Sequence, residues 1–191
     1  MKTFISLSAL FLSLTLTAQT SPATWYLNDT SQNGIQSSSN TASGWFSTAM
    51  GYQTEASGNH STATGRNTQA SGDRSTAMGY QTEASGYAST AMGYQTQASG
   101  YTSTATGRNT QAIGDYSTAV GFYTTASGYA STAMGANTTA SGIYSTSIGL
   151  NNMASGDRST AMGFYTTASG TASTAMGYQT KASDNSSLVV G

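Results

Sequence analysis

The sequence has little charge, a single proline and no cysteine. Charged residues make up 7% of the 191 residues, against about 25% in ordinary soluble domains. The net charge of −1 at pH 7 provides no basic surface for nucleic acid or anionic lipid, so we expect no nucleic-acid partner. The absence of cysteine excludes disulfides as a source of stability outside the cell.

Large aliphatic residues are also scarce, so a conventional core of Leu, Ile, Val and Phe cannot be built. The chain contains 22 glycines instead. A chain that is short of both large apolar groups and charge is either disordered or repetitive, with order that comes from the backbone.

Residues 1–18 are predicted to be a secretory signal peptide. Lys2 supplies the positive start, and an apolar stretch with several Ser and Thr runs from Phe4 to Leu16. A transmembrane anchor is the alternative, but the stretch is shorter than the ~20 residues that span a membrane, and no membrane insertion is expected. We therefore expect an exported protein, held at the cell surface or outer membrane or secreted. Residues 19–39 do not match the repeat described next and are expected to cap its first coil.

From residue 40 to residue 191 the chain is a repeat with a period of fourteen. Each period divides into two halves of seven, which read S-T-A-M-G at Ser47 to Gly51 and T-x-A-S-G at Thr54 to Gly58. Serine recurs without a slip at Ser47, Ser61, Ser75, Ser89, Ser103, Ser117, Ser131, Ser145, Ser159, Ser173 and Ser187. Such fixed spacing is typical of stacked coils, because one extra residue would displace every later side chain from its column.

Each half alternates small and larger residues with period two, which favours strands. Two glycines per period would cost a helix about 1 kcal/mol each. We predict an all-β parallel solenoid of ten fourteen-residue coils, preceded by an incomplete one, with strands at Ser47–Gly51 and Thr54–Gly58 and their translations. Stacking at about 4.8 Å per coil makes this array roughly 50 Å long.

The alternation also predicts which residues face inward. So short a coil has room inside only for small groups, so Ser47, Ala49, Gly51 and the Thr54/Ala56/Gly58 set are expected inside, with their hydroxyls bonded to the backbone at the turns. The apolar outward column of the first strand comprises Met50, Met78, Met92, Val120, Met134, Ile148, Met162 and Met176, interrupted by Thr64 and Thr106. The second strand turns Glu55, Gln69, Glu83, Gln97 and Gln111 outward. The alternative places the apolar column inside and the small residues outside.

An exposed apolar ribbon of this length exceeds what a monomer usually tolerates. The simplest way to bury it is against other copies of the same chain. The sequence therefore predicts self-association through the Met50-to-Met176 column.

The period S-T-A-M-G-x-x-T-x-A-S-G-x-x resembles the head repeats of YadA-like trimeric autotransporter adhesins, S-x-A-x-G-x-x-A-x-A-x-G-x-x, over residues 40–191. The resemblance implies a left-handed parallel β-roll and a homotrimer with the methionine column as its interface. It also implies a head that attaches to extracellular matrix proteins or cells at a bacterial surface. The repeat stops in mid-coil at Gly191, without the stalk and membrane barrel that such adhesins carry, so we expect either a fragment or a stand-alone head.

No enzymatic activity, cofactor or metal is expected. His60 is the only histidine and occupies a turn position that holds Arg74 or Tyr116 in other coils. Asp73, Asp115 and Asp157 recur only every third coil, too sparsely for a calcium-binding β-roll, and are attributed to solubility.

Aromatic residues recur at the turns. Stacking predicts that Arg66 lies between Tyr52 and Tyr80 in a cation–π arrangement. Such columns stabilise the stack or provide rigid binding surface; for the second role the candidates are Tyr80, Tyr87, Tyr94 and Tyr101.

Two other functions fit the repeat. One is a structural spacer in a surface fibre. The other is ice binding, suggested by the unbroken rank of outward threonines from Thr48 to Thr174. The flexible methionines beside that rank argue against a rigid match to ice.

Overall fold

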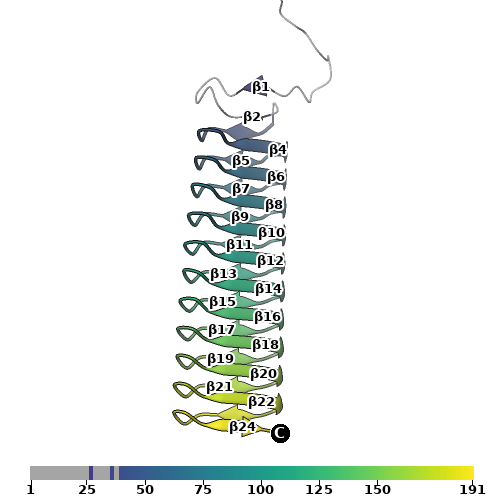
Figure 1. Ribbon diagram of the computed structural model, residues 1–191. Helices are drawn as coiled ribbons and strands as arrows, with labels where there is room; N and C mark the ends of the chain where they lie inside the picture. Colours follow the sequence, from purple (N-terminus) through teal and green to yellow (C-terminus); the bar gives the residue numbers. More distant parts are fainter. Residues whose placement is uncertain (1–25, 28–34, 37–38) are drawn as a thin grey trace, which may run out of the picture.

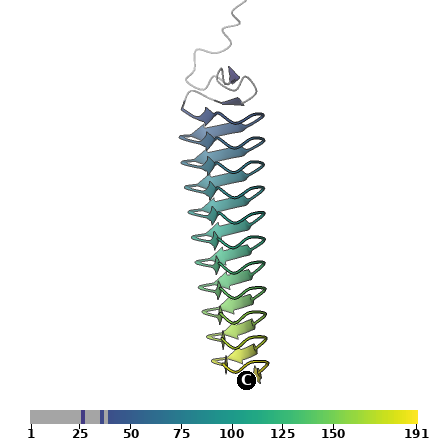
Figure 2. The same cartoon turned by 90° about the vertical axis from the view of Figure 1, so that its left-hand side faces the viewer.

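The structure is a long roll of stacked coils. The computed structural model describes residues 26–27, 35–36 and 39–191 (Figure 1). The predicted signal peptide (1–18) lies outside the described residues, as does most of the predicted cap (19–39). Two views at right angles show the coils stacked along one axis, each contributing one longer and one shorter strand (Figures 1 and 2).

The longer strands form the first sheet. They are β4 (Thr48–Tyr52), β6 (Thr62–Arg66), β8 (Thr76–Tyr80), β10 (Thr90–Tyr94), β12 (Thr104–Arg108), β14 (Thr118–Phe122), β16 (Thr132–Ala136), β18 (Thr146–Leu150), β20 (Thr160–Phe164), β22 (Thr174–Tyr178) and β24 (Leu188–Val190). With β1 (Tyr26–Leu27) and β2 (Ile35–Gln36) they make a 13-stranded sheet.

The shorter strands form the second sheet, which has 11 strands. They are β3 (Thr41–Ala42), β5 (Glu55–Ala56), β7 (Gln69–Ala70), β9 (Glu83–Ala84), β11 (Gln97–Ala98), β13 (Gln111–Ala112), β15 (Thr125–Ala126), β17 (Thr139–Ala140), β19 (Met153–Ala154), β21 (Thr167–Ala168) and β23 (Lys181–Ala182).

Between coils both sheets are parallel, and each strand residue from β3 to β23 pairs with its equivalent in the next coil. Ala49 pairs with Ala63 in the first sheet, and Ala56 pairs with Ala70 in the second. The same register holds through β22 and β23. The predicted parallel β-solenoid with fourteen-residue coils is therefore confirmed, with the coil that starts at Asn40 bringing the number of turns to about 11.

The strand bounds differ from those predicted. The first strand runs from Thr48 to Tyr52 rather than from Ser47 to Gly51, because the chain turns only at Gln53, which has a φ of 53°. The second strand is limited to Glu55–Ala56 instead of Thr54–Gly58. The N–H groups of Ser57 and Gly58 both donate to the carbonyl of Ala70, at 3.0 and 3.2 Å, so the regular ladder ends there.

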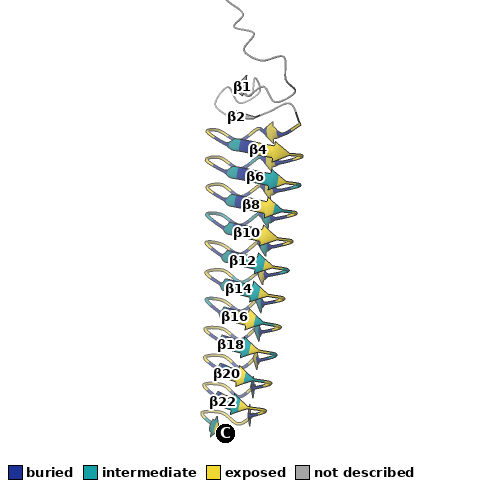
Figure 3. Ribbon diagram, turned by 90° about the vertical axis from the view of Figure 1, so that its right-hand side faces the viewer, coloured by how far each residue is buried: buried dark blue, intermediate teal, exposed yellow. Residues whose placement is uncertain are grey.

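The interior is built from small residues, as predicted. Ala49, Ala56 and the equivalent residues of the coils up to Ala182 are buried. Met50 is 36% exposed, so the alternative with the apolar column inside is wrong. Figure 3 shows the resulting alternation of buried and exposed residues along every coil.

Gly51 was expected inside with these residues, and this prediction is wrong. Gly51 is exposed and has a φ of 130°. A Cβ at this position would overlap the carbonyl oxygen of Gly65 in the next coil. Glycine is needed here because of the close approach between coils, not because of limited space in the interior.

The interior hydroxyls behave only partly as predicted. Ser47 Oγ donates to the carbonyl of Gly44 at 2.7 Å, and Ser103 Oγ donates to that of Gly100 at 2.8 Å. The buried hydroxyls of Thr54 and its equivalents, and of most equivalent serines, have no hydrogen-bond partner among the described residues. The small size of these side chains, more than hydrogen bonding by their hydroxyls, explains why they occupy the interior.

Two short strands precede the first complete coil. β2 pairs with β4 in parallel, with Ile35 opposite Thr48, and β1 pairs with β2 in the antiparallel sense. They lie beside the sheet edge where the cap segment was expected, and capping itself stays a prediction.

Candidate functional site

The apolar column on the first sheet faces outward and is interrupted at Thr64 and Thr106. Adjacent strands place Met78 opposite Met92, Val120 opposite Met134, and Ile148 opposite Met162. Members of the column are exposed or half-buried throughout. Position and pairing therefore agree with the expectation from sequence, and its role as a trimer interface stays a prediction.

The second sheet presents a polar face. Gln69 Nε2 donates to Glu55 Oε2 at 3.2 Å, and Gln97 Nε2 donates to Glu83 Oε2 at 3.3 Å. These side chains bond to the neighbouring coil, so this part of the face is a row of amide–carboxylate pairs. It has no resemblance to the apolar column on the other sheet.

The corner after the first strand stacks aromatic rings and guanidinium groups. The Arg66 guanidinium carbon lies 5.7 Å from the Tyr52 ring centroid and 5.6 Å from that of Tyr80. The predicted cation–π sandwich is therefore confirmed. The Tyr80 ring stacks on that of Tyr94 at 5.0 Å, and Arg108 extends the stack over Tyr94 at 5.3 Å.

The corner after the second strand carries a second aromatic column. Tyr87 and Tyr101 stack with ring centroids 5.0 Å apart. Tyr101, Tyr116 and Tyr129 then follow in edge-to-face contacts at 5.4 and 5.5 Å. The four candidate tyrosines thus form two stacked pairs on separate corners; Tyr94 and Tyr101 are exposed, whereas Tyr80 and Tyr87 are half-buried.

One member of this column has a perturbed acidity. Partial desolvation, followed by the neighbouring Tyr101, Tyr129 and Asp115, raises the pKa of Tyr116 above its ordinary value of 10.0. A tyrosinate at this position would lie beside the Asp115 carboxylate and beside Tyr101 and Tyr129, which become negative when they lose their own protons. Repulsion between like charges disfavours the charged form of Tyr116.

Aspartates at the same corner have a structural role that the sequence reading missed. Asp73 Oδ1 accepts a hydrogen bond from the backbone N–H of Asn59 at 2.8 Å, and Asp115 Oδ1 accepts one from Tyr101 at 2.8 Å. Asp157 does the same for Ile143 at 3.0 Å. Attribution to solubility alone was wrong. The signal in the sequence is that Asn185 and Asn59, which make the same bond, occupy the same column.

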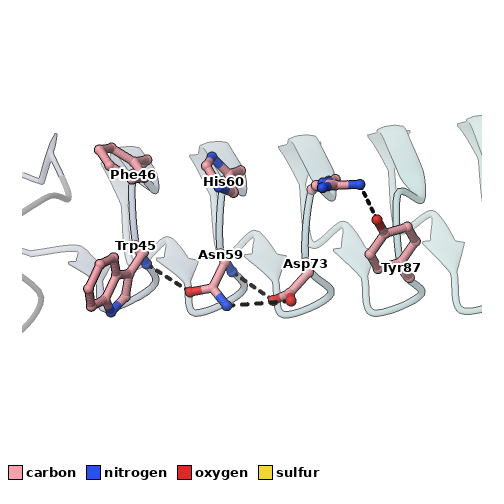
Figure 4. A pocket seen from close by; sticks show the side chains of 7 residues that line it. Trp45, Phe46, Asn59, His60, Asp73 and Tyr87 are labelled. Atoms are coloured by element: carbon pink, nitrogen blue, oxygen red, sulfur yellow. Dashed lines mark hydrogen bonds between the residues drawn. The ribbon is translucent and has the colours of Figure 1, made fainter.

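The N-terminal end of this corner is hollowed. A cavity of about 370 Å³ is lined by Trp45, Phe46, Asn59, His60, Asp73, Arg74 and Tyr87. Figure 4 shows these side chains in two parallel rows that come from successive coils. Sequence analysis did not single out this group, because its members belong to two different positions of the repeat.

The described part of the chain offers few groups for catalysis or metal binding. His60 stacks on Phe46, with ring centroids 5.2 Å apart. Within residues 26–27, 35–36 and 39–191, no three His, Cys, Asp or Glu side chains come together as metal ligands do. The same residues contain no helix with the length and apolar character needed to cross a membrane.

Comparison with protein families gives one match. The description of that family is "YadA head domain repeat (2 copies)", and it matches residues 42–68, 56–82, 70–96, 84–110, 98–124, 112–138, 126–152, 140–166 and 168–191. Successive matches from 42 to 166 are offset by one coil, the same register as the strands. No individual curated protein matches the chain.

Proposed function

The chain belongs to the YadA head repeat family, and we propose that residues 40–191 form the head of a trimeric adhesin that attaches to extracellular matrix proteins or cell surfaces. In this proposal the roll is left-handed, exported and held at a bacterial surface or secreted. It acts by binding and not by catalysis.

The observation that carries the proposal is the pair of aromatic corner columns on a rigid roll. Tyr94 and Tyr101 are 41% and 44% exposed, and stacking holds each ring against its neighbour. Rings that are already ordered lose little conformational entropy on binding. Their recurrence along the stack at about 4.8 Å per coil suits many weak contacts that add up along an extended ligand.

The apolar column supports trimerisation. Met78 is 42% exposed in the isolated chain, and the column extends from β4 to β22, interrupted by threonine in β6 and β12. An apolar ribbon of this length is typical of a protein–protein interface. The Glu/Gln rows on the second sheet lack this character, so they remain on the outside of the proposed trimer.

Attachment of beads coated with the protein to matrix proteins and to cells tests this function. Replacing Tyr80, Tyr87, Tyr94 and Tyr101 together with Ser should lower attachment about tenfold or more, because avidity multiplies the loss at each contact. The matched control replaces Gln69, Glu83, Gln97 and Gln111 with Ser, since these lie on the polar face in the same part of the roll. If the control replacements lower attachment and the tyrosine replacements leave it unchanged, the adhesive surface is the polar face instead.

A further inference from the structure

The cavity at the N-terminal end of the second corner combines aromatic walls with fixed polar groups. Two rows of side chains border it, with Phe46 and His60 in one row and Trp45, Asn59, Asp73 and Tyr87 in the other (Figure 4). Arg74, which follows Asp73 as His60 follows Asn59, completes the lining. Its volume of about 370 Å³ lies at the low end of the range of about 300–1,000 Å³ that is usual for small-molecule sites, and it is open to solvent rather than enclosed.

The aromatic side chains present flat apolar surface. Trp45 is 60% exposed and Phe46 is 58% exposed, which are the highest exposed fractions of any aromatic side chains at this end of the roll. The Phe46 and His60 rings are nearly parallel, with an angle of 19° between their planes. At the other end of the cavity the Arg74 guanidinium lies 5.3 Å from the Tyr87 ring centroid.

The polar groups are held in place and keep free bonding capacity. Asp73 accepts from the backbone N–H of Asn59 at 2.8 Å and from its Nδ2 at 3.4 Å. A carboxylate offers about four acceptor positions, so two bonds do not exhaust it. Arg74 donates one N–H to the Tyr87 hydroxyl, and a guanidinium has about five. The site is therefore preorganised, with both donors and acceptors available to a ligand.

We propose that this cavity binds a neutral oligosaccharide. A pyranose ring has an apolar face of C–H groups that packs on aromatic rings, and hydroxyls that both donate and accept hydrogen bonds. Asp73 supplies acceptors, Arg74 supplies donors, and their opposite charges cancel, which favours a neutral ligand. Trp45 and Tyr87 are three coils apart, roughly 14 Å at ~4.8 Å per coil, a span that accommodates about two or three sugar units.

The chain contains its own comparison site. Asp157 and Arg158 repeat Asp73 and Arg74 six coils later. Asp157 makes the same bond to the preceding coil, from the N–H of Ile143 at 3.0 Å. The other five lining positions differ there, and hold Tyr129, Ala130, Ile143, Tyr144 and Thr171. The polar pair is thus repeated without the tryptophan and without the tyrosine on which the arginine packs.

The inference rests on the proposed attachment function for its biological meaning, because glycans cover cells and many matrix proteins. The binding step is independent of it and is measured without cells. If the wild-type chain binds sugar while replacement of the four tyrosines leaves attachment unchanged, the attachment proposal fails and the site stands. If attachment depends on the tyrosine columns while no sugar binds, the sugar site fails and the attachment proposal stands.

Calorimetric titration of the full chain with neutral di- and trisaccharides of glucose, galactose and N-acetylglucosamine tests the site. Trp45→Ala and Arg74→Ala should each weaken binding about tenfold or more. Asp73→Asn keeps the acceptor oxygen that Asn59 and Asn185 use in this column, so it should fold normally and bind several-fold more weakly. The controls Arg158→Ala and Asp157→Asn should leave binding unchanged.

Three results would overturn the proposal. One is the absence of binding to any of these sugars at millimolar concentration by the folded wild-type chain. Another is binding that Trp45→Ala and Arg74→Ala leave intact while circular dichroism shows that they fold. The third is binding only to sialylated or other acidic sugars, which would make Arg74 the anchor of an anionic ligand.

Discussion

The side chain of Asn152 ties its own coil to the next: its Nδ2 donates to the carbonyl oxygen of Gly163 at 2.8 Å. The same Nδ2 donates to the carbonyl of Ile148 at 2.6 Å, and Oδ1 accepts from the N–H of Thr166 at 2.8 Å. Asn40 makes the corresponding bonds to Gly51 and Thr54. Every other complete coil has threonine at this buried position.

Asn152→Ala should therefore destabilise the roll by about 1–3 kcal/mol, because it leaves buried backbone groups without these partners. Asn152→Thr, which restores the residue found in other coils, is the matched control and should cost less. Denaturant unfolding monitored by circular dichroism measures both. An Asn152→Thr variant as stable as the wild-type chain would show that the three bonds contribute nothing beyond packing, because threonine at this position makes no such bond in the other coils.

The same coil breaks the alanine core. Ser147 stands where the other complete coils have alanine, is completely buried, and its hydroxyl has no partner among the described residues. Ser147→Ala should raise the free energy of unfolding by about 1 kcal/mol, because it removes a buried polar group without opening a cavity. Ala133→Ser, one coil earlier in the same column, should lower it. Unchanged stability of both variants would contradict this account of the interior.

The period determined most of what could be predicted. Because each coil repeats the last, the Ala49 and Met50 columns follow from counting, and so do the stacked Arg66 and Tyr80. The residue at which the first strand ends could not be predicted in this way. The strand ends because Gln53 adopts a positive φ of 53°, and glutamine as a residue type does not require that conformation. The bond from Asn59 to Asp73 depends on one side-chain rotamer, which a repeat pattern does not contain.

The raised pKa of Tyr116 predicts alkaline sensitivity. Because the folded protein holds this proton more tightly than the unfolded chain, stability is fully present below pH 10 and falls as pH rises through the ordinary tyrosine pKa of 10.0 and beyond. Asp115→Asn should lower the pKa of Tyr116, since it removes a neighbouring negative charge. Titration of the tyrosines by NMR measures the shift.

Asparagine is a suitable replacement at position 115, because Asn185 makes the equivalent backbone bond to Thr171 at 3.0 Å. Asp157→Asn removes the same charge three coils away and should leave the titration of Tyr116 where it was. A Tyr116 that titrates alike in all three proteins would exclude the Asp115 charge as a cause.

The apolar column, together with membership of the YadA head repeat family, predicts a homotrimer that charge can dissociate. Without its predicted signal peptide, the chain should sediment at three times the monomer mass. Replacing Met78, Met92 and Met134 with Asp should shift it to monomer, because each change places an unpaired charge in a desolvated interface.

Replacing Gln69, Gln97 and Gln111 with Asp adds the same charge to the opposite face and should leave the trimer intact. A wild-type chain that is monomeric and soluble at micromolar concentration would refute the trimer. Only the methionine face is apolar enough to need a partner, so only the methionine variant should dissociate. If both triple variants dissociate alike, the added net charge and not the lost apolar contact is the cause.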